Sequence, residues 1–374
     1  MPSPLGDLAL LFLRLGATGF GGPAAHVALM ETEVVRRRGW LSHQEFLDLL
    51  GAANLVPGPN STELAIHIGH RRAGWRGLLV AGACFILPAA LVTLALAAAY
   101  VQFRTLPELG AVLRGVKPVV IAVVLLAIVA LGRTAIKGPS LAVLCVLCAV
   151  LNGLGVNELA LLLSAGGASA ALEAGRRFPT TSGPALFVPH ALLVPGPPVI
   201  AASFSLGALF LASLKIGAVL YGSGYVLLAF LRADFVERLG WLTEAQLLDA
   251  VAVGQVTPGP VLTTATFVGY LLAGPAGAAV ATVAIFLPAF LFVALSGPLV
   301  PRLRRSPIAG AFLDGVNVAS LALMAVVTWH LGRAALVDLP TVLLAATSVL
   351  ALVRFRVNTA WLVLAGGLAG LASG

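Results

Sequence analysis

Charged residues are scarce in this sequence of 374 residues: they make up only 10% of the chain, where a soluble domain has about a quarter. This scarcity excludes a cytosolic enzyme of ordinary composition. Apolar residues make up 59%, the mean hydropathy is +1.02, and the apolar runs are long enough to cross a bilayer. We therefore expect an all-α polytopic membrane protein embedded in the lipid bilayer, with no room for a sizeable soluble domain.

Cysteine is also rare, and the motifs of ATP-driven or hydrolytic chemistry are missing. Cys84, Cys145 and Cys148 lie inside apolar runs, which is typical of packed thiols and not of a disulfide or metal site. His67 and His70 lack the acidic and thiol neighbours that a metal site needs. No Walker A, hydrolase elbow or zinc-protease motif occurs. We expect no cofactor, no metal and no enzymatic activity.

The excess of basic residues, 23 against 15 acidic ones, is expected to orient the chain in the membrane. A membrane protein uses such an excess mainly for topology. We therefore expect no nucleic-acid partner.

The chain contains an internal repeat. The tetrapeptide Gly39-Trp40-Leu41-Ser42 recurs as Gly240-Trp241-Leu242-Thr243, and Pro57-Gly58-Pro59 recurs as Pro258-Gly259-Pro260. A Pro-rich stretch separates the two copies. The expected organisation is a first repeat at 1–174, a linker at 175–203 and a second, inverted repeat at 204–374.

The loop charges predict that the two repeats have opposite orientations. Arg71, Arg72 and Arg76 follow the first Pro-Gly-Pro segment, whereas the equivalent stretch 271–277 has no basic residue. One segment later the bias reverses, with three arginines in 300–306 against Arg104 alone. Because parallel copies would keep the same bias, inverted repeats are favoured, and each must then cross the membrane an odd number of times.

Six apolar segments occur in each half, so one of them must fail to cross. The segment with Pro-Gly-Pro in its middle is the obvious candidate, because these residues interrupt a helix and favour a broken or re-entrant one. We expect ten spans, two re-entrant elements and both termini outside, with Arg36–Arg38 and Arg71–Arg76 on the same side. The expected segments are 5–29, 46–69, 77–101, 111–132, 138–152 and 157–173, then 204–231, 247–270, 277–299, 310–332, 335–353 and 357–372.

Hydroxyl and amide residues follow each Pro-Gly-Pro break. A helix that restarts at Asn60, Ser61 or Thr62 would have a good N-cap and several unpaired N–H groups, which attract an anion. Thr263 and Thr264 follow the second break. The alternative is that Pro-Gly-Pro only kinks a packed helix and the hydroxyls bond back to carbonyl groups.

A basic residue also lies inside an apolar segment of each repeat. Arg14 and Lys215 occupy equivalent positions, and charges there need a compensating partner. Glycine-rich sequence follows each of them and can turn backbone N–H groups toward the same ligand. Together with the helix ends, two cations suit a small oxyanion with a charge near minus two. The alternative is that Arg14 and Lys215 neutralise Asp48 and Asp249. The glycines are Gly21, Gly22 and Gly222.

Two acidic residues are candidates for proton coupling. Glu63 follows the first break, and Asp314 begins a span at the position equivalent to Arg114. Desolvation of a carboxyl in a membrane favours its protonated form. The alternative for both residues is ordinary ion pairing.

Several motifs together resemble the chromate ion transporter (CHR) family. FGGP, RRGWL and PGPNST occur in the first half, and the second half resembles a diverged copy, with Val261 and Leu262 in place of a polar pair. The resemblance implies a bacterial inner-membrane protein of the long, two-copy type that exports chromate, with sulfate as a related dianion. It also implies that Arg14, Gly21-Gly22 and Asn60-Ser61-Thr62 belong to the functional core.

Electrostatics favours export. Moving a dianion out of an inside-negative cell gains about 4.6 kcal/mol per 100 mV, at about 2.3 kcal/mol per charge. Proton exchange is an alternative driving force. The alternative functions are a sulfate or anion importer, a channel, and a lipid-phosphate flippase or membrane enzyme. A homodimer is one assembly that the sequence allows.

Overall fold

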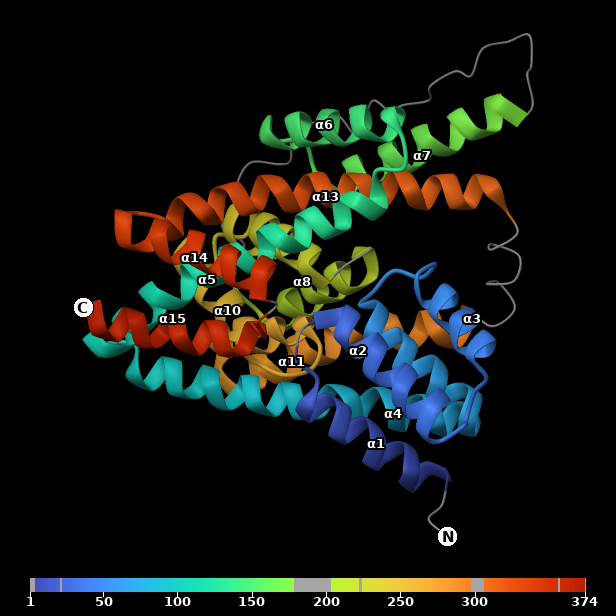
Figure 1. Cartoon of the computed structure of the whole chain (residues 1–374), viewed down its shortest axis with the longest axis horizontal. Helices are drawn as coiled ribbons and strands as arrows, with labels where there is room; N and C mark the ends of the chain where they lie inside the picture. Colours follow the sequence, from blue (N-terminus) through green and yellow to red (C-terminus); the bar gives the residue numbers. More distant parts are fainter. Residues whose placement is uncertain are drawn as a thin grey trace.

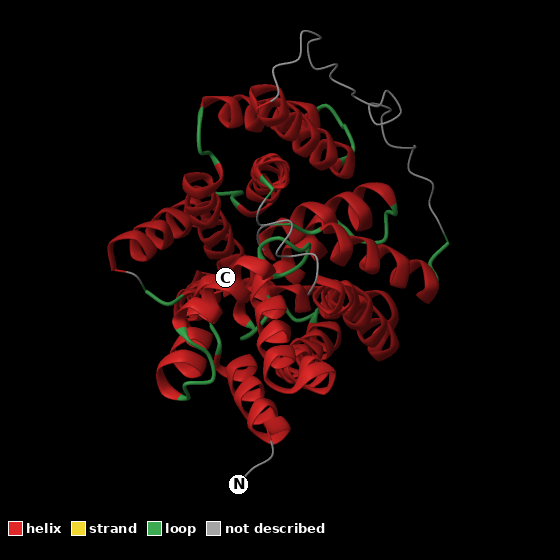
Figure 2. Ribbon diagram, turned by 90° about the vertical axis from the view of Figure 1, so that its right-hand side faces the viewer, coloured by secondary structure: helices red, strands yellow, loops and turns green. Residues whose placement is uncertain are grey.

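The computed structural model describes residues 4–20, 22–177, 203–221, 224–296, 306–355 and 357–373, which form helices and turns without a strand (Figures 1 and 2). This agrees with the expected all-α class. The first half consists of α1 (Pro4–Thr18), α2 (Gly22–Glu31), the π-helical turn η1 (Thr32–Arg37), α3 (His43–Ala53), α4 (Asn60–Phe103), α5 (Pro107–Ala135), α6 (Pro139–Gly153) and α7 (Glu158–Arg177). The second half consists of α8 (Leu206–Val219), η3 (Gly224–Val226), α9 (Leu227–Leu231), η4 (Arg232–Arg238), α10 (Glu244–Val256), η5 (Val261–Thr263), α11 (Thr264–Ser296), α13 (Pro307–Ala335), α14 (Leu339–Phe355) and α15 (Thr359–Ser373).

Four helical segments of the described chain are long and apolar enough to cross a membrane, and shorter apolar helices accompany them. The long segments are Asn60–Phe103, Pro107–Ala135, Val261–Ser296 and Pro307–Ala335. The expected number of ten crossings stays a prediction. The expected segment 5–29 is not one helix, because α1 ends at Thr18 and α2 begins at Gly22, whose φ of +77° suits glycine. In the second half, 204–231 is interrupted in the same way after α8.

A sharp reversal divides α4 into two helical parts. Gly74 has φ 59° and ψ −146°, a conformation open to glycine alone, and beyond it the helix turns back on itself. Gly69 and Gly77 then meet so closely that a Cβ on Gly69 would lie 2.3 Å from the Gly77 carbonyl oxygen. The second half repeats this hairpin at Gly274, with Gly269 against Gly277. The expected segments before and after the reversal are therefore separate helices that pack on each other.

The first Pro-Gly-Pro element begins and ends at the same edge of the structure. The guanidinium groups of Arg38 and Arg72 both lie over the Trp40 ring, 5.1 and 5.0 Å from its centre. Arg71, near the end of the element, also pairs with Glu45 at its beginning, at 3.1 Å. The two ends of the element thus lie together, and the placement of both arginine groups on one side of the membrane stays a prediction.

Glu45 caps α3 at this edge. Hydrogen bonds from the Ser42 backbone and hydroxyl, with Arg71 nearby, hold the pKa of Glu45 below its usual range. The carboxylate therefore remains charged near neutral pH.

The two halves interlock through reciprocal contacts. α7 of the first half packs along α13, and α15 of the second half packs along α5 (Figure 1). Gly132 faces Leu321 while Gly332 faces Ile121, so the equivalent helices α5 and α13 run antiparallel. Antiparallel packing of equivalent membrane helices is what inverted repeats require.

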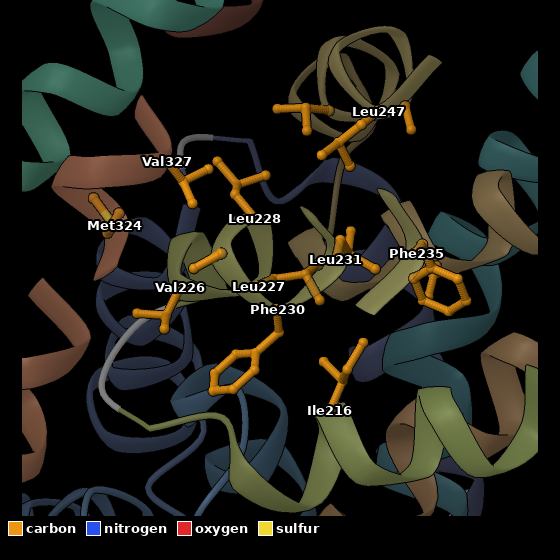
Figure 3. Packing of buried hydrophobic residues seen from close by; sticks show 14 of the residues in the cluster. Ile216, Val226, Leu227, Leu228, Phe230, Leu231, Phe235, Leu247, Met324 and Val327 are labelled. Atoms are coloured by element: carbon orange, nitrogen blue, oxygen red, sulfur yellow. The ribbon is translucent and has the colours of Figure 1, made fainter. Parts of the chain in front are cut away.

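The second half supplies much of the buried core. Leu227, Leu228 and Leu231 of α9 pack with Ile216 of α8 and Leu247 of α10 (Figure 3). Of the expected linker, residues 175–177 belong to α7, and 178–202 lie outside the described residues.

Candidate functional site

Each Pro-Gly-Pro break lies against a helix end of the opposite repeat. The Gly58 N–H donates to the Leu220 carbonyl at 2.6 Å, and the Gly259 N–H donates to the Gly19 carbonyl at 2.8 Å. Gly19 and Leu220 are equivalent positions, each just after the first helix of its repeat. These two hydrogen bonds bring both breaks into contact with the repeat interface.

His26 connects the two breaks. Its Nε2 lies 2.9 Å from the Gly19 carbonyl, and its Nδ1 lies 3.3 Å from the Ser61 hydroxyl. A carbonyl only accepts, so Nε2 donates, and Nδ1 of the neutral ring accepts from Ser61. Because Gly19 also accepts from Gly259, the buried His26 holds Ser61 in a fixed relation to the second break.

The two breaks differ in polarity. Asn60 and Ser61 follow the first break, whereas Val261 and Leu262 follow the second. His26 is matched by Leu227, so the polar contact with Ser61 has an apolar counterpart in the second repeat. The polar surface is therefore concentrated at the first break.

The hydroxyl groups of the second break are already occupied. Thr263 donates to the Pro260 carbonyl and Thr264 to the Val261 carbonyl, both at 2.8 Å. For this repeat the structure thus shows the alternative in which hydroxyls bond back to the backbone. In the first break, by contrast, the Thr62 hydroxyl and both Glu63 carboxyl oxygens have no hydrogen-bond partner among the described residues.

Glu63 is completely buried against the break itself. A Cβ on Gly58 would lie 2.2 Å from its Oε1, so only glycine leaves room for this carboxyl. Gly58 also has φ +142°, where other residues are strained. The break is therefore shaped around the Glu63 side chain.

A cavity of about 240 Å³ opens beside the first break. Asn60 and Tyr221 line it, together with Lys137 and Asp314, which pair at 2.6 Å. Asp314 is thus ion-paired, as the alternative to proton coupling proposed. Ser320 contributes a buried hydroxyl that has no partner within the described ranges. The cavity offers hydrogen-bond donors and the Lys137–Asp314 ion pair to a small polar ligand.

Several residues of this cavity were not expected from the sequence: Asn54, Thr134, Lys137, Tyr221, Asn317 and Ser320. One signal was available for Lys137. Its partner Asp314 is equivalent to Arg114, and Lys137 lies next to Gly138, the position equivalent to Asp338, so a base and an acid are exchanged between the repeats at nearly the same positions. Such an exchange suggests that the positions face each other.

Arg14 and Lys215 have acidic partners, but not the expected ones. Arg14 Nη2 lies 3.3 Å from Glu33 Oε1, and Lys215 Nζ lies 2.8 Å from Asp234 Oδ1. These acids are equivalent positions in η1 and η4. The alternative that named Asp48 and Asp249 is therefore corrected, because the π-helical turns bring nearer carboxylates to both cations.

Each acid also binds a second basic residue, Arg37 for Glu33 and Arg238 for Asp234, at 2.7 and 2.9 Å. Asp249 instead pairs with Lys117 and accepts from Tyr100, both at 2.8 Å.

The glycines after Arg14 and Lys215 are only partly described. Gly22 begins α2, and a Cβ there would lie 3.3 Å from the Tyr225 hydroxyl of the second repeat. Gly21 and Gly222 lie outside the described residues.

A model of the chromate transporter family matches residues 6–171 and again residues 207–371. The chain belongs to the chromate transporter family. It is 33% identical to the chromate transport protein of Cupriavidus metallidurans, over 97% of this chain and 91% of the relative. It is 34% identical to a probable chromate transport protein of Synechococcus elongatus, over 91% and 88%, and 32% identical to the chromate transport protein of Pseudomonas aeruginosa, over 99% and 93%.

The family match confirms the expected resemblance, and its two parts coincide with the two repeats. No solved structure matches the chain. The chain is thus a multi-pass membrane protein of a transporter family.

Proposed function

We propose that this protein exports chromate and related tetrahedral oxyanions, such as sulfate, across the bacterial inner membrane. The observation that carries the proposal is a contrast between the two helix starts: the Thr62 hydroxyl and the Glu63 carboxyl after the first break have no partner among the described residues, whereas Thr263 and Thr264 after the second break bond back to the backbone. The names of the relatives supply chromate as the substrate to test.

In this proposal the anion binds at the beginning of α4. The helix N-terminus and the Thr62 hydroxyl supply donors. Asn60, whose amide donates to Asn54 at 2.7 Å, lines the adjoining cavity, where Lys137, paired with Asp314, supplies a positive charge. Ser61 is oriented by His26. Thr263 and Thr264 of the second break are bonded to the backbone and do not bind the anion. The second break instead positions the first, because Gly259 donates to the Gly19 carbonyl, which His26 connects to Ser61.

In this proposal Arg14 and Lys215 stabilise the site and do not bind the anion. Both are ion-paired with acids that are almost fully buried, and the Arg14 side chain is 56% exposed. We propose that they fix the π-helical turns and add to the positive potential around the site, without touching the anion.

The membrane potential is the proposed driving force. A dianion that leaves an inside-negative cell gains about 4.6 kcal/mol per 100 mV, at about 2.3 kcal/mol for each charge. Import of the same ion would need at least two coupled cations. A homodimer stays a prediction, which the mass of the detergent-solubilised protein checks.

Everted membrane vesicles test the direction of transport. Export by the cell becomes uptake into such vesicles, so an imposed inside-positive potential should accelerate chromate uptake by the parent. Asn60→Val, which introduces the residue of the second repeat, should reduce uptake at least tenfold. Leu262→Met is the matched control and should leave it unchanged. Uptake that is insensitive to the potential would contradict the membrane potential as the driving force, and the absence of uptake into everted vesicles would contradict export.

A further inference from the structure

Three titratable side chains form a stripe along the first part of α4. Glu63, His67 and His70 are spaced four and three residues apart, which places them on one face of a helix, about 5–6 Å apart between successive Cβ atoms. Glu63 is fully buried and His67 is 7% exposed. Both Glu63 oxygens and His67 Nε2 have no hydrogen-bond partner in the described part of the chain. Buried polar atoms without partners are rare in native proteins and call for an explanation.

The stripe leads from the break to the aqueous edge of the protein. His70 is only partly buried, and its ring lies 5.6 Å from the ring of Trp75, beside the reversal at Gly74. The next residues, Arg71 and Arg72, are exposed. A proton could thus pass between water and Glu63 along one helix face.

The second repeat does not contain this stripe. Thr263 or Thr264 replaces Glu63, Phe267 or Val268 replaces His67, and Tyr270 replaces His70. The helical hairpin itself is present in both halves. The stripe is therefore not needed for the fold of the hairpin, and its presence in the polar half suggests a function there.

An ionised Glu63 would lack compensation in this structure. No ion pair of Glu63 occurs within the described ranges. The groups that face it from other elements are Tyr221, which lies near enough to interact electrostatically, and His26, which reaches the neighbouring Ser61. Neither is a permanent cation. A buried charge of this kind is disfavoured, so a bound proton is the simplest way to keep Glu63 neutral.

We propose that Glu63 carries a proton that binds together with the oxyanion and is exchanged with water through His67 and His70. The inference rests on the proposed function, because it places the anion at the start of the same helix. A negative Glu63 would repel an anion bound three residues or fewer away, whereas a neutral Glu63 would not. Proton and anion therefore favour each other's binding and move in the same direction.

The proton balance is simple. A proton from water protonates His70 and then His67, and the His67 imidazolium passes it to the Glu63 carboxylate. The imidazoles end neutral, Glu63 ends as a neutral carboxyl, and one proton has been taken from solution. The complex then moves one net negative charge with each dianion instead of two.

Proton uptake on chromate binding tests the inference. Purified protein in weakly buffered detergent solution is mixed with chromate, and the protons taken up are measured together with the affinity between pH 6 and 9. For the parent we expect one proton per bound chromate at the alkaline end, where affinity falls tenfold per pH unit. Glu63→Gln should bind without that proton, and its affinity should not fall. Protonation of chromate itself is common to both proteins and cancels in the comparison.

Two further variants separate the role of each residue. Glu45→Gln removes an exposed carboxylate from the other end of the element and should bind with the parent's proton count. His67→Ala should keep the proton count and slow proton uptake at least tenfold. If Glu63→Gln does not fold, Glu63→Asp decides, because a shorter carboxyl should keep the proton count and shift the pH at which affinity falls.

Equal proton uptake by the parent and Glu63→Gln, or an unshifted pH profile for Glu63→Asp, would overturn the inference. So would chromate binding by the parent that requires sodium and takes up no proton. Absence of chromate binding by the folded parent would instead refute the proposed function.

Discussion

The charge clusters of η1 and η4 predict an unequal effect of removing the acid and the base. Asp234 accepts from Lys215 and Arg238, and its side chain is 3% exposed, whereas those of Lys215 and Arg238 are 34% and 41% exposed. Asp234→Asn leaves two cations without a partner. Removing one partner of a fully buried pair costs about 3–5 kcal/mol, and the partial exposure of both cations lowers our expectation to about 2–3 kcal/mol.

Lys215→Met should cost much less. Arg238 remains 2.9 Å from Asp234 and keeps it paired, and removing an ammonium group from an apolar segment offsets part of the loss. We expect less than about 1 kcal/mol, in the range of a single exposed ion pair. The double variant should be more stable than Asp234→Asn alone, because one of the two unpaired cations is gone.

The assay is the midpoint of thermal unfolding in detergent, for the parent and the three variants. Each kcal/mol corresponds to roughly 2–4 °C in domains of 150–250 residues, so the acid and base variants should be clearly separated. Glu33→Gln and Arg14→Met provide the same comparison in the first repeat, where Glu33 also lies near Arg38. Lys215→Met as destabilising as Asp234→Asn would refute the reasoning.

Three further predictions concern the hairpin and the polar site. Gly69→Val should destabilise the protein by about 1–3 kcal/mol or more, because its Cβ would overlap the facing backbone, whereas Gly110→Ala has open space and should be neutral in the same unfolding assay. His26→Leu removes the link to Ser61 and should cost about 1–3 kcal/mol, measured as a lower unfolding midpoint; an unchanged midpoint would show that the link is not stabilising. Lys137→Met should weaken chromate binding at least tenfold in equilibrium dialysis, and unchanged affinity would exclude the cavity as part of the site.

Local chemistry explains which parts of the fold the sequence could predict. Proline and glycine act on their own backbone, so the helix breaks at both Pro-Gly-Pro sequences could be predicted from the residues alone. Connections between 46–69 and 77–101 and between 247–270 and 277–299 were expected, but not that each is a tight reversal at Gly74 or Gly274. Matching glycines were visible, but the close contact of Gly69 with Gly77 exists only after the chain has turned back.

The residues that form ion pairs and hydrogen bonds with the candidate site residues were harder to predict, because they come from other helices and turns. Glu33 and Asp234 are nineteen residues from the bases they bind, and no short spacing connects them. The hydrogen bond of His26 with Ser61 depends on how the first helix end packs against the break. Lys137 reaches Asp314 only through the packing of the two repeats.

Equilibrium chromate binding by proteins with exchanged breaks tests the central claim most directly. In one variant Asn60→Val and Ser61→Leu give the first break the residues of the second, and in the control Val261→Asn and Leu262→Ser do the reverse. The account predicts at least a tenfold loss of affinity in the first variant and no loss in a folded control. Undiminished binding by the first variant would contradict the assignment of the oxyanion to the first Pro-Gly-Pro break.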